Sequence, residues 1–138
     1  MTPLPDTDPV AVQRVVDFWR ALDAVVVTEK PETHDEIVAH VSHLPHALAS
    51  VLCATLAARD RRWRALAGPG LRDTTRIAAS DEDLWRAIFQ LNREEVLRSI
   101  RAFQDELEAF QAALANDDFF ALRAILERGR DYREGFGS

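Results

Sequence analysis

Apolar side chains recur at the spacing of helices over most of this chain, with one short exception near the N-terminus. One face of the first helical stretch is formed by Val12, Val15, Val16, Trp19 and Leu22. Asp8 and Pro9 predict where this helix begins, because aspartate caps a helix and proline suits the first helical position. The exception, AVVVT at residues 24–28, is short and β-branched and therefore predicts a strand.

A second helical pattern comes directly after this segment. Thr33 and Glu36 have the spacing of a capping box, which predicts that the helix begins there. Pro45 lies inside the pattern, and proline removes a backbone hydrogen bond and usually kinks a helix. We therefore expect a kink beside His43 and His46.

A third helical region comes after the segment GPGLRDTTR at residues 68–76, which predicts a loop. Ser80 with Asp83 predicts the cap of one long helix. Apolar residues in that helix alternate at spacings near three and four, the a/d pattern of a seam between helices. This seam consists of Phe89, Val96, Ile100, Phe103, Leu107, Phe110 and Leu114. Residues 116–118, Asn-Asp-Asp, predict a break and the cap of a last helix, which carries Phe119, Leu122, Ile125 and Leu126.

These elements predict a mainly all-α fold from residue 31 onward, organised around a long helix. A single strand cannot form a sheet by itself. The segment 24–28 is therefore expected either to pair with the N-terminal TPLP segment or to belong to a sheet that this chain does not contain.

Composition narrows the classes of function. The chain has 138 residues and a net charge of −6, from 17 basic and 23 acidic side chains, so it lacks the basic footprint of a nucleic-acid-binding domain. No apolar run approaches the roughly 18 residues that a membrane span needs. The N-terminus does not resemble a signal peptide, and one cysteine allows no internal disulfide. We expect a cytoplasmic protein that contacts neither nucleic acid nor membrane.

All four histidines lie between His34 and His46, and three interpretations of this cluster compete. Spacings of three residues among His40, His43 and His46 could bring imidazoles to a metal, with Asp35 as an oxygen ligand, but no HExxH or CxxC motif supports this. The cluster could also be a coincidence on a helix.

The third interpretation is a pocket for an anionic ligand. Arg72 and Arg76 lie in and after the glycine-containing segment, and guanidinium groups bind carboxylates through paired hydrogen bonds. Histidines near them can donate to the same ligand. Arg76 could instead form a structural ion pair, for example with Asp35, and both roles are compatible.

The residues in these segments resemble the C-terminal helical dimerisation and substrate-binding domain of the prephenate dehydrogenase family, which includes arogenate-specific members. The resemblance extends over essentially the whole chain. The matching positions are His34 and Asp35; Ser42, His43, Leu44, Pro45 and His46; Arg72, Asp73, Thr75, Arg76, Ile77 and Ala78; and Trp85 and Asn92.

The resemblance implies a role in tyrosine biosynthesis, where NAD or NADP takes a hydride from prephenate as carbon dioxide leaves to give 4-hydroxyphenylpyruvate. Arg76 would hold a substrate carboxylate, oriented by Asp35, while His43 and His46 would line the pocket near the pyruvyl side chain. Ser42, Arg72 and Trp85 would shape the pocket. The structural or orienting positions would be His34, Asp35, Asp73 and Asn92. The seam would form a homodimer, and no metal would be required.

The family's nucleotide-binding half is not represented, because no GxGxxG motif comes after a strand here. Residues 1–30 resemble the last strand–helix–strand piece of that half, and residues 31–138 form the helical domain. We therefore expect no catalytic residue and no bound cofactor on this chain, and no turnover by the chain alone. The alternative is a stand-alone helical dimer that binds an aromatic or anionic effector without catalysis. A GxGxxG-bearing segment upstream in the same reading frame would argue against that alternative.

Overall fold

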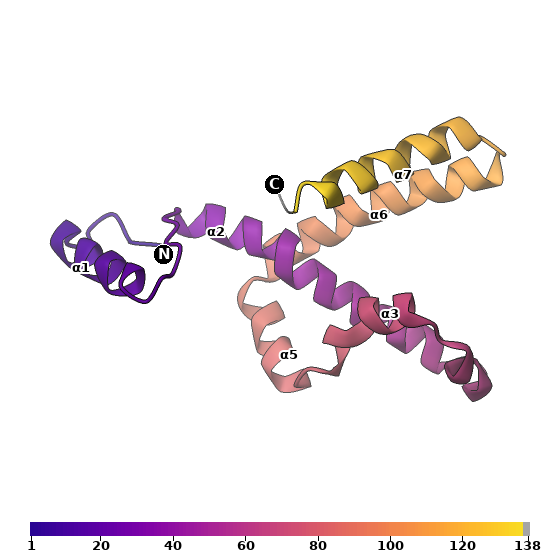
Figure 1. Ribbon diagram of the computed structural model, residues 1–138, viewed down its shortest axis with the longest axis horizontal. Helices are drawn as coiled ribbons and strands as arrows, with labels where there is room; N and C mark the ends of the chain where they lie inside the picture. The colour runs from indigo at the N-terminus through magenta and orange to yellow at the C-terminus, as the bar shows by residue number, and fades with distance from the viewer. Residues whose placement is uncertain (137–138) are drawn as a thin grey trace. The chain divides into compact units, whose positions relative to one another are not determined.

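A computed structural model describes residues 1–136, and over these residues it contains α-helices and no strand (Figure 1). The all-α prediction is confirmed. The α-helices are α1 Pro9–Arg20, α2 Pro31–Val38, α3 Leu44–Ala57, α4 Pro69–Thr75, α5 Glu82–Leu91, α6 Arg93–Ala115 and α7 Phe119–Glu134. Shorter segments are the π-helix η1 Ala39–His43 and the 3-10 helices η2 Arg61–Leu66 and η3 Arg76–Ala79. Contacts divide the chain into one unit over residues 1–96 and another from residue 97 onward.

The predicted strand at residues 24–28 is not seen in the described chain. The segment has no helical structure, and its backbone bonds to Met1 at two points. The amino group of Met1 donates to the carbonyl of Val27 at 2.7 Å, and the amide of Glu29 donates to the carbonyl of Met1 at 3.0 Å. Two bonds to one residue do not make a ladder, and Val25 stays 93% exposed. The assignment of residues 1–30 to the end of a nucleotide-binding domain stays a prediction.

The first helix begins where the sequence predicts. The Asp8 side chain accepts a hydrogen bond from the amide of Val10, and Pro9 occupies the first turn of α1. The predicted Thr33–Glu36 capping box is wrong, because α2 already begins at Pro31 without a side-chain cap. Pro31 favours the start of the helix without a side-chain cap, because the N–H that proline lacks is not needed at the first helical position.

Helices α2, η1 and α3 form one continuous helix over Pro31–Ala57, which is 27 residues long. An 18-residue window of it has a mean hydropathy of 1.4, so it could cross a membrane by length and composition alone, contrary to our expectation. A helix packed inside a soluble protein meets the same criterion. Here α3 packs against α4 and η3, and the helix carries all four histidines and Pro45.

Two further predictions fail between residues 68 and 92. Residues 68–76 are not a loop, because Pro69 begins α4 and the Thr75 hydroxyl donates to the carbonyl of Leu71 at 2.7 Å. The cap of α5 is Asp81, one residue after the predicted Ser80, and its side chain accepts from the amide of Leu84.

The predicted long helix is interrupted at Asn92, whose φ of −111° and ψ of 34° are not helical. Phe89 therefore lies on α5, while the rest of the predicted seam lies on α6. Val96 is buried, and Leu107 and Leu114 are 52% and 49% exposed. The remaining seam residues are half-buried.

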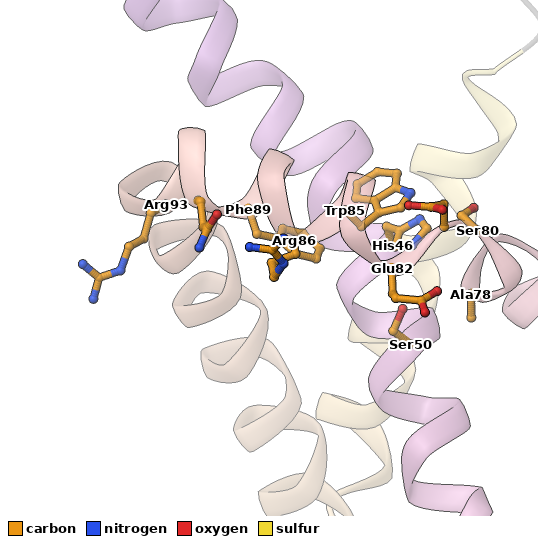
Figure 2. Close-up of a pocket in the computed structure, with 11 residues that line it drawn as sticks. His46, Ser50, Ala78, Ser80, Glu82, Trp85, Arg86, Phe89 and Arg93 are labelled. Atoms are coloured by element: carbon orange, nitrogen blue, oxygen red, sulfur yellow. The ribbon is translucent and has the colours of Figure 1, made fainter.

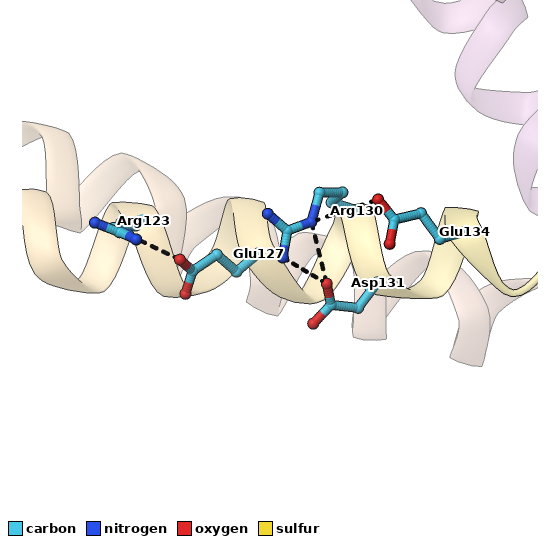
Figure 3. Close-up of polar contacts among 5 residues, drawn as sticks. All are labelled: Arg123, Glu127, Arg130, Asp131 and Glu134. Atoms are coloured by element: carbon cyan, nitrogen blue, oxygen red, sulfur yellow. Dashed lines mark hydrogen bonds and ion pairs between the residues drawn. The ribbon is translucent and has the colours of Figure 1, made fainter.

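In the second unit, α6 and α7 lie side by side as an antiparallel hairpin (Figure 1). The turn contains Asp117 at a φ of 55°, and Asp118 caps α7 by accepting from the amide of Ala121, as residues 116–118 predicted. A hydrogen bond from Arg128 to Glu106, 2.8 Å long, joins the two helices. Along α7, Arg123 pairs with Glu127, and Arg130 with Asp131 and Glu134 (Figure 3).

The described chain buries few apolar side chains by itself. Those buried are Val16, Ala39, Ala49, Val96 and Ala113, three of them alanines. Large apolar side chains remain exposed in both units, including Leu91 at 88% in the first and Phe120 at 91% in the second. Contiguous exposed apolar surface typically marks a protein–protein interface.

Candidate functional site

Four rings from α3, α5 and the π-helix η1 come together in the first unit. The imidazole of His46 stacks on the indole of Trp85, with centroids 3.4 Å apart and planes inclined by 13°. His43 meets the same indole edge-on, with centroids 6.1 Å apart. Phe89, one turn further along α5, lies 5.5 Å from Trp85 and 6.4 Å from His46. We call these four rings the aromatic wall. Only His46 and Trp85 are nearly parallel, because the planes of His43 and Phe89 are inclined to that of Trp85 by 82° and 47°.

Burial disfavours the charged form of the stacked histidine. His46 is only 4% exposed, and removal from water lowers the pKa of its imidazole below 6.5. A neutral imidazole stacks on the indole without the desolvation cost of a cation. Burial is also the main cause that lowers the pKa of His43, opposed by the charge of Asp35 and reinforced by His34.

The π-helix places His43, and Pro45 accounts for it. Proline has no N–H, and its ring crowds the carbonyl four residues earlier, so the regular ladder cannot continue. The amide of Leu44 donates instead to the carbonyl of Ala39, five residues back. A π-turn inserts one extra residue, which rotates the helix before it by about 100° relative to the helix after it. The predicted irregularity beside His43 and His46 is present in this form.

Asn92 connects the break between α5 and α6 to the histidine helix. Its amide nitrogen Nδ2 donates to the carbonyl of Asp35 at 2.8 Å and lies 3.3 Å from Nδ1 of His43. Asn92 separates α5 from α6 in sequence. Its partners Asp35 and His43 lie 57 and 49 positions earlier in the chain. It therefore fixes the start of α6 against α2 and η1.

An open cavity of about 530 Å³ lies beside the stacked rings (Figure 2). His46 and Trp85 form part of its wall, and Glu82 and Ser50 lie close to them. The lining residues are His46, Ser50, Ala78, Ser80, Asp81, Glu82, Trp85, Arg86, Phe89, Gln90 and Arg93. The volume is within the range typical of small-molecule sites.

Charged groups at this cavity come mainly from α5. Arg86 is held by Asp83, with Nη2 to Oδ1 at 3.1 Å, and Asp81 is occupied as the helix cap. Arg93 extends away from the ring cluster in Figure 2. The sequence motifs did not single out Glu82, Arg86, Gln90 or Arg93. The spacing of three to four residues among Glu82, Trp85, Arg86, Phe89 and Gln90 is the signal that could have identified one face of α5.

The other predicted site residues lie outside this cavity lining. Ser42, Arg72 and Arg76 are exposed, and within the described chain neither arginine pairs with a carboxylate. The expected Asp35–Arg76 ion pair is not formed, because Asp35 bonds to Nδ1 of neighbouring His34 at 2.9 Å. Asp73 is exposed, and its carbonyl accepts from the amide of Arg76 at the end of α4.

The four histidines have four different partners. His34 contacts Asp35, and Nδ1 of His40 lies 2.9 Å from the carbonyl of Glu36. His43 contacts Asn92, and His46 stacks on Trp85. Over residues 1–136, no three His, Cys, Asp or Glu side chains are grouped so that they could hold a metal ion.

Comparison with known proteins identifies the family. The prephenate dehydrogenase, dimerization domain family matches residues 30–128. This chain belongs to that family. The matched region contains the aromatic wall, the π-helix, Asn92 and most of the α6–α7 hairpin of the dimerization domain.

Two relatives illustrate the similarity in sequence. The domain is 28% identical over 138 residues to a prephenate dehydrogenase of Bacillus subtilis and 30% identical over 125 residues to that of Lactococcus lactis. These alignments cover 98% and 88% of this chain but only 37% and 35% of the two relatives. The chain thus spans little more than a third of their length.

The crystal structure of prephenate dehydrogenase from A. aeolicus, in complex with hydroxyphenyl propionate and NAD+, superposes with a TM-score of 0.91. The sequence identity is 33%, and the alignment covers 98% of this chain and 48% of that one. The resemblance seen in the sequence motifs is therefore confirmed at the level of family and fold.

Proposed function

We propose that this dimerization domain supplies the substrate-binding wall and the dimer interface of a prephenate dehydrogenase. The full enzyme would carry out NAD(P)-dependent oxidative decarboxylation of prephenate, or of arogenate, to the 4-hydroxyphenyl product. The stacked pair of His46 and Trp85 beside the cavity is the observation that carries this proposal, because it lies within the family match.

The chemistry of the ligand fits the residues present. Prephenate combines a six-membered ring with two carboxylates, and the ligand of the A. aeolicus enzyme combines a ring with one. Aromatic side chains stabilise a ring by contact, and neutral imidazoles can donate hydrogen bonds to carboxylate or carbonyl oxygens.

Arg76 is proposed to hold a substrate carboxylate. It is exposed and has no carboxylate partner in the described chain, and it lies two residues before Ala78, which lines the cavity. Guanidinium binds carboxylate through two parallel hydrogen bonds, which fixes orientation as well as charge. His43 and His46 would face the pyruvyl side chain, and Ser42 and Arg72 would complete the rim.

The residues described do not fit a nicotinamide cofactor. A dinucleotide-binding loop uses glycines because the pyrophosphate approaches the backbone closely, after a strand and before a helix. Gly68 and Gly70 come after no strand, and a Cβ at either position would meet nothing within 4 Å. No step of hydride transfer is assigned to this chain, and cofactor binding is proposed to reside in another part of the full enzyme.

The dimer proposal rests on exposed apolar surface in each unit. Leu91 and Phe120 are almost fully exposed, and Leu107 and Leu114 of the seam are about half exposed. A second copy that covers these side chains would remove apolar surface from water, at roughly 25 cal/mol per Å².

Calorimetric titration of the purified chain with prephenate tests the proposal. We expect saturable binding without NAD reduction, and we expect Trp85→Ala to weaken binding while Trp63→Ala, an exposed tryptophan outside the cavity, does not. Absence of prephenate binding, or equal binding by both variants, would refute the role of the aromatic wall.

A further inference from the structure

Asn92 is held in place by its own backbone on both sides. Its amide donates to the carbonyl of Ile88 at 3.1 Å, and its carbonyl accepts from the amide of Val96 at 3.1 Å. The end of α5 and the start of α6 thus both fix its position. The Asn92 side chain therefore has little freedom to reach partners other than the carbonyl of Asp35 and the ring of His43.

The orientation of the Asn92 amide is set by one of its partners. A backbone carbonyl only accepts hydrogen bonds, so the group 2.8 Å from the carbonyl of Asp35 must be the NH2 and not the oxygen. The same nitrogen lies 3.3 Å from Nδ1 of His43. One NH2 group has two hydrogens, and each has an acceptor here.

The orientation of Asn92 determines the tautomer of His43. Because Nδ2 of Asn92 can only donate, Nδ1 of His43 must accept, and the ring proton is then on Nε2. Within the described residues, no hydrogen bond from Nε2 of His43 is formed. His43 is not itself part of the cavity lining, but it contacts Trp85, which is.

We propose that Asn92 is a positioning residue that holds His43 as the neutral Nε2–H tautomer, ready to donate to an anionic oxygen of the substrate. The donor function rests on the proposed function above, whereas the tautomer does not. The asparagine acts through His43 and is not required to touch the ligand.

The surroundings of His43 agree with a neutral ring. Burial lowers its pKa, and the T-shaped contact with Trp85 brings no negative charge to the ring. Asp35 favours the charged ring, but its carboxylate bonds to His34, and His34 itself disfavours a further positive charge nearby. Protonation of Nδ1 would also set an N–H against the NH2 of Asn92.

Side-chain nitrogen NMR of the histidines in this chain tests the proposal, because it distinguishes protonated from unprotonated ring nitrogens. In the wild-type chain above pH 6.5, the ordinary pKa of histidine, we expect an unprotonated Nδ1 and a protonated Nε2 for His43. In Asn92→Asp, a carboxylate replaces the donor, and we expect loss of the unprotonated Nδ1 signal together with a raised His43 pKa.

The chain offers a matched control. Asn116 also donates from Nδ2 to a backbone carbonyl, that of Ala112 at 2.8 Å, and contacts no histidine. Asn116→Asp should leave the His43 signals unchanged. The exposed ring of His40 serves as an internal reference in each spectrum.

Two results would overturn the proposal: a wild-type His43 protonated on Nδ1, or a folded Asn92→Asp variant whose His43 signals match the wild type. If Asn92→Asp does not fold, the wild-type spectrum still decides the tautomer, and Asn92→Ala provides the second variant. Prephenate titration separates the two proposals, because the predicted tautomer without prephenate binding would refute only the proposed function.

Discussion

The imidazole of His46 lies flat on the indole of Trp85, with their centroids 3.4 Å apart, although the two residues are 39 positions apart in sequence. This contact joins the helix that contains the histidines to α5. It also forms part of the wall of a cavity in the first unit, so the stability of this unit and the proposed ligand binding both involve this pair of rings.

Trp85→Ala should therefore lower the free energy of unfolding. A half-buried tryptophan that loses its aromatic partners should cost about 2–4 kcal/mol, of which about 0.5–1.5 kcal/mol reflects ring contacts beyond buried area. Urea denaturation followed by circular dichroism measures the change. Trp63→Ala, which removes a tryptophan that is 56% exposed, should change the free energy by much less. Equal losses in both variants would mean that the stacked pair has no special role.

Acidification should destabilise the first unit. Burial lowers the pKa of both His43 and His46 below 6.5, so the unfolded chain binds protons more strongly than the folded chain. The stability is fully present above about pH 6.5 and falls as the pH drops from there toward the lowered folded-state pKa values.

Urea denaturation at about pH 7.5 and about pH 5 measures this dependence. His46→Phe keeps a ring on Trp85 but removes one titrating group, so this variant should lose less stability at low pH than the wild type. His40→Gln, at an exposed position on the same continuous helix, should lose as much stability at low pH as the wild type. A wild-type stability that is constant over this range would contradict the assignment.

Arg76→Ala should weaken prephenate binding strongly. Loss of a charge-assisted bidentate contact costs on the order of 2–4 kcal/mol, which corresponds to roughly thirty- to several-hundredfold in the dissociation constant. Calorimetric titration measures it, and Arg101→Ala, an exposed arginine on α6, is the matched control. An unchanged dissociation constant for Arg76→Ala would reject its role as the carboxylate ligand.

Local sequence signals predicted much of this structure. The caps Asp8 and Asp118 are where the sequence places them, and helical periodicity located α1, α3, α6 and α7. Each of these depends on residues within one or two turns. Tertiary placement, by contrast, is not contained in such short-range patterns.

The failures have identifiable physical causes. Residues 24–28 have strand propensity, but the described chain supplies no strand beside them, and propensity alone does not form a sheet. The Gly-Pro-Gly sequence suggested a loop, whereas Pro69 begins a helix there. The motif residues His46 and Trp85 line the cavity and His43 contacts Trp85, but the α5 residues beside them had no motif to mark them.

Leu107→Asp should convert the proposed dimer to monomer. An aspartate at this seam position would place an unpaired charge in the apolar interface, which costs several kcal/mol. Light scattering coupled to size exclusion measures the mass, and Gln104→Asp, an exposed polar position on the same helix, should remain dimeric. A Leu107→Asp chain that still has the mass of a dimer would show that the seam lies within one subunit.

Native mass spectrometry of the chain with and without prephenate tests the central claim most directly, because it reports oligomeric state, bound metal and bound ligand together. We predict a metal-free dimer that gains the mass of prephenate, and a Trp85→Ala dimer that gains less. A chain that retains a metal ion and does not bind prephenate would contradict this claim.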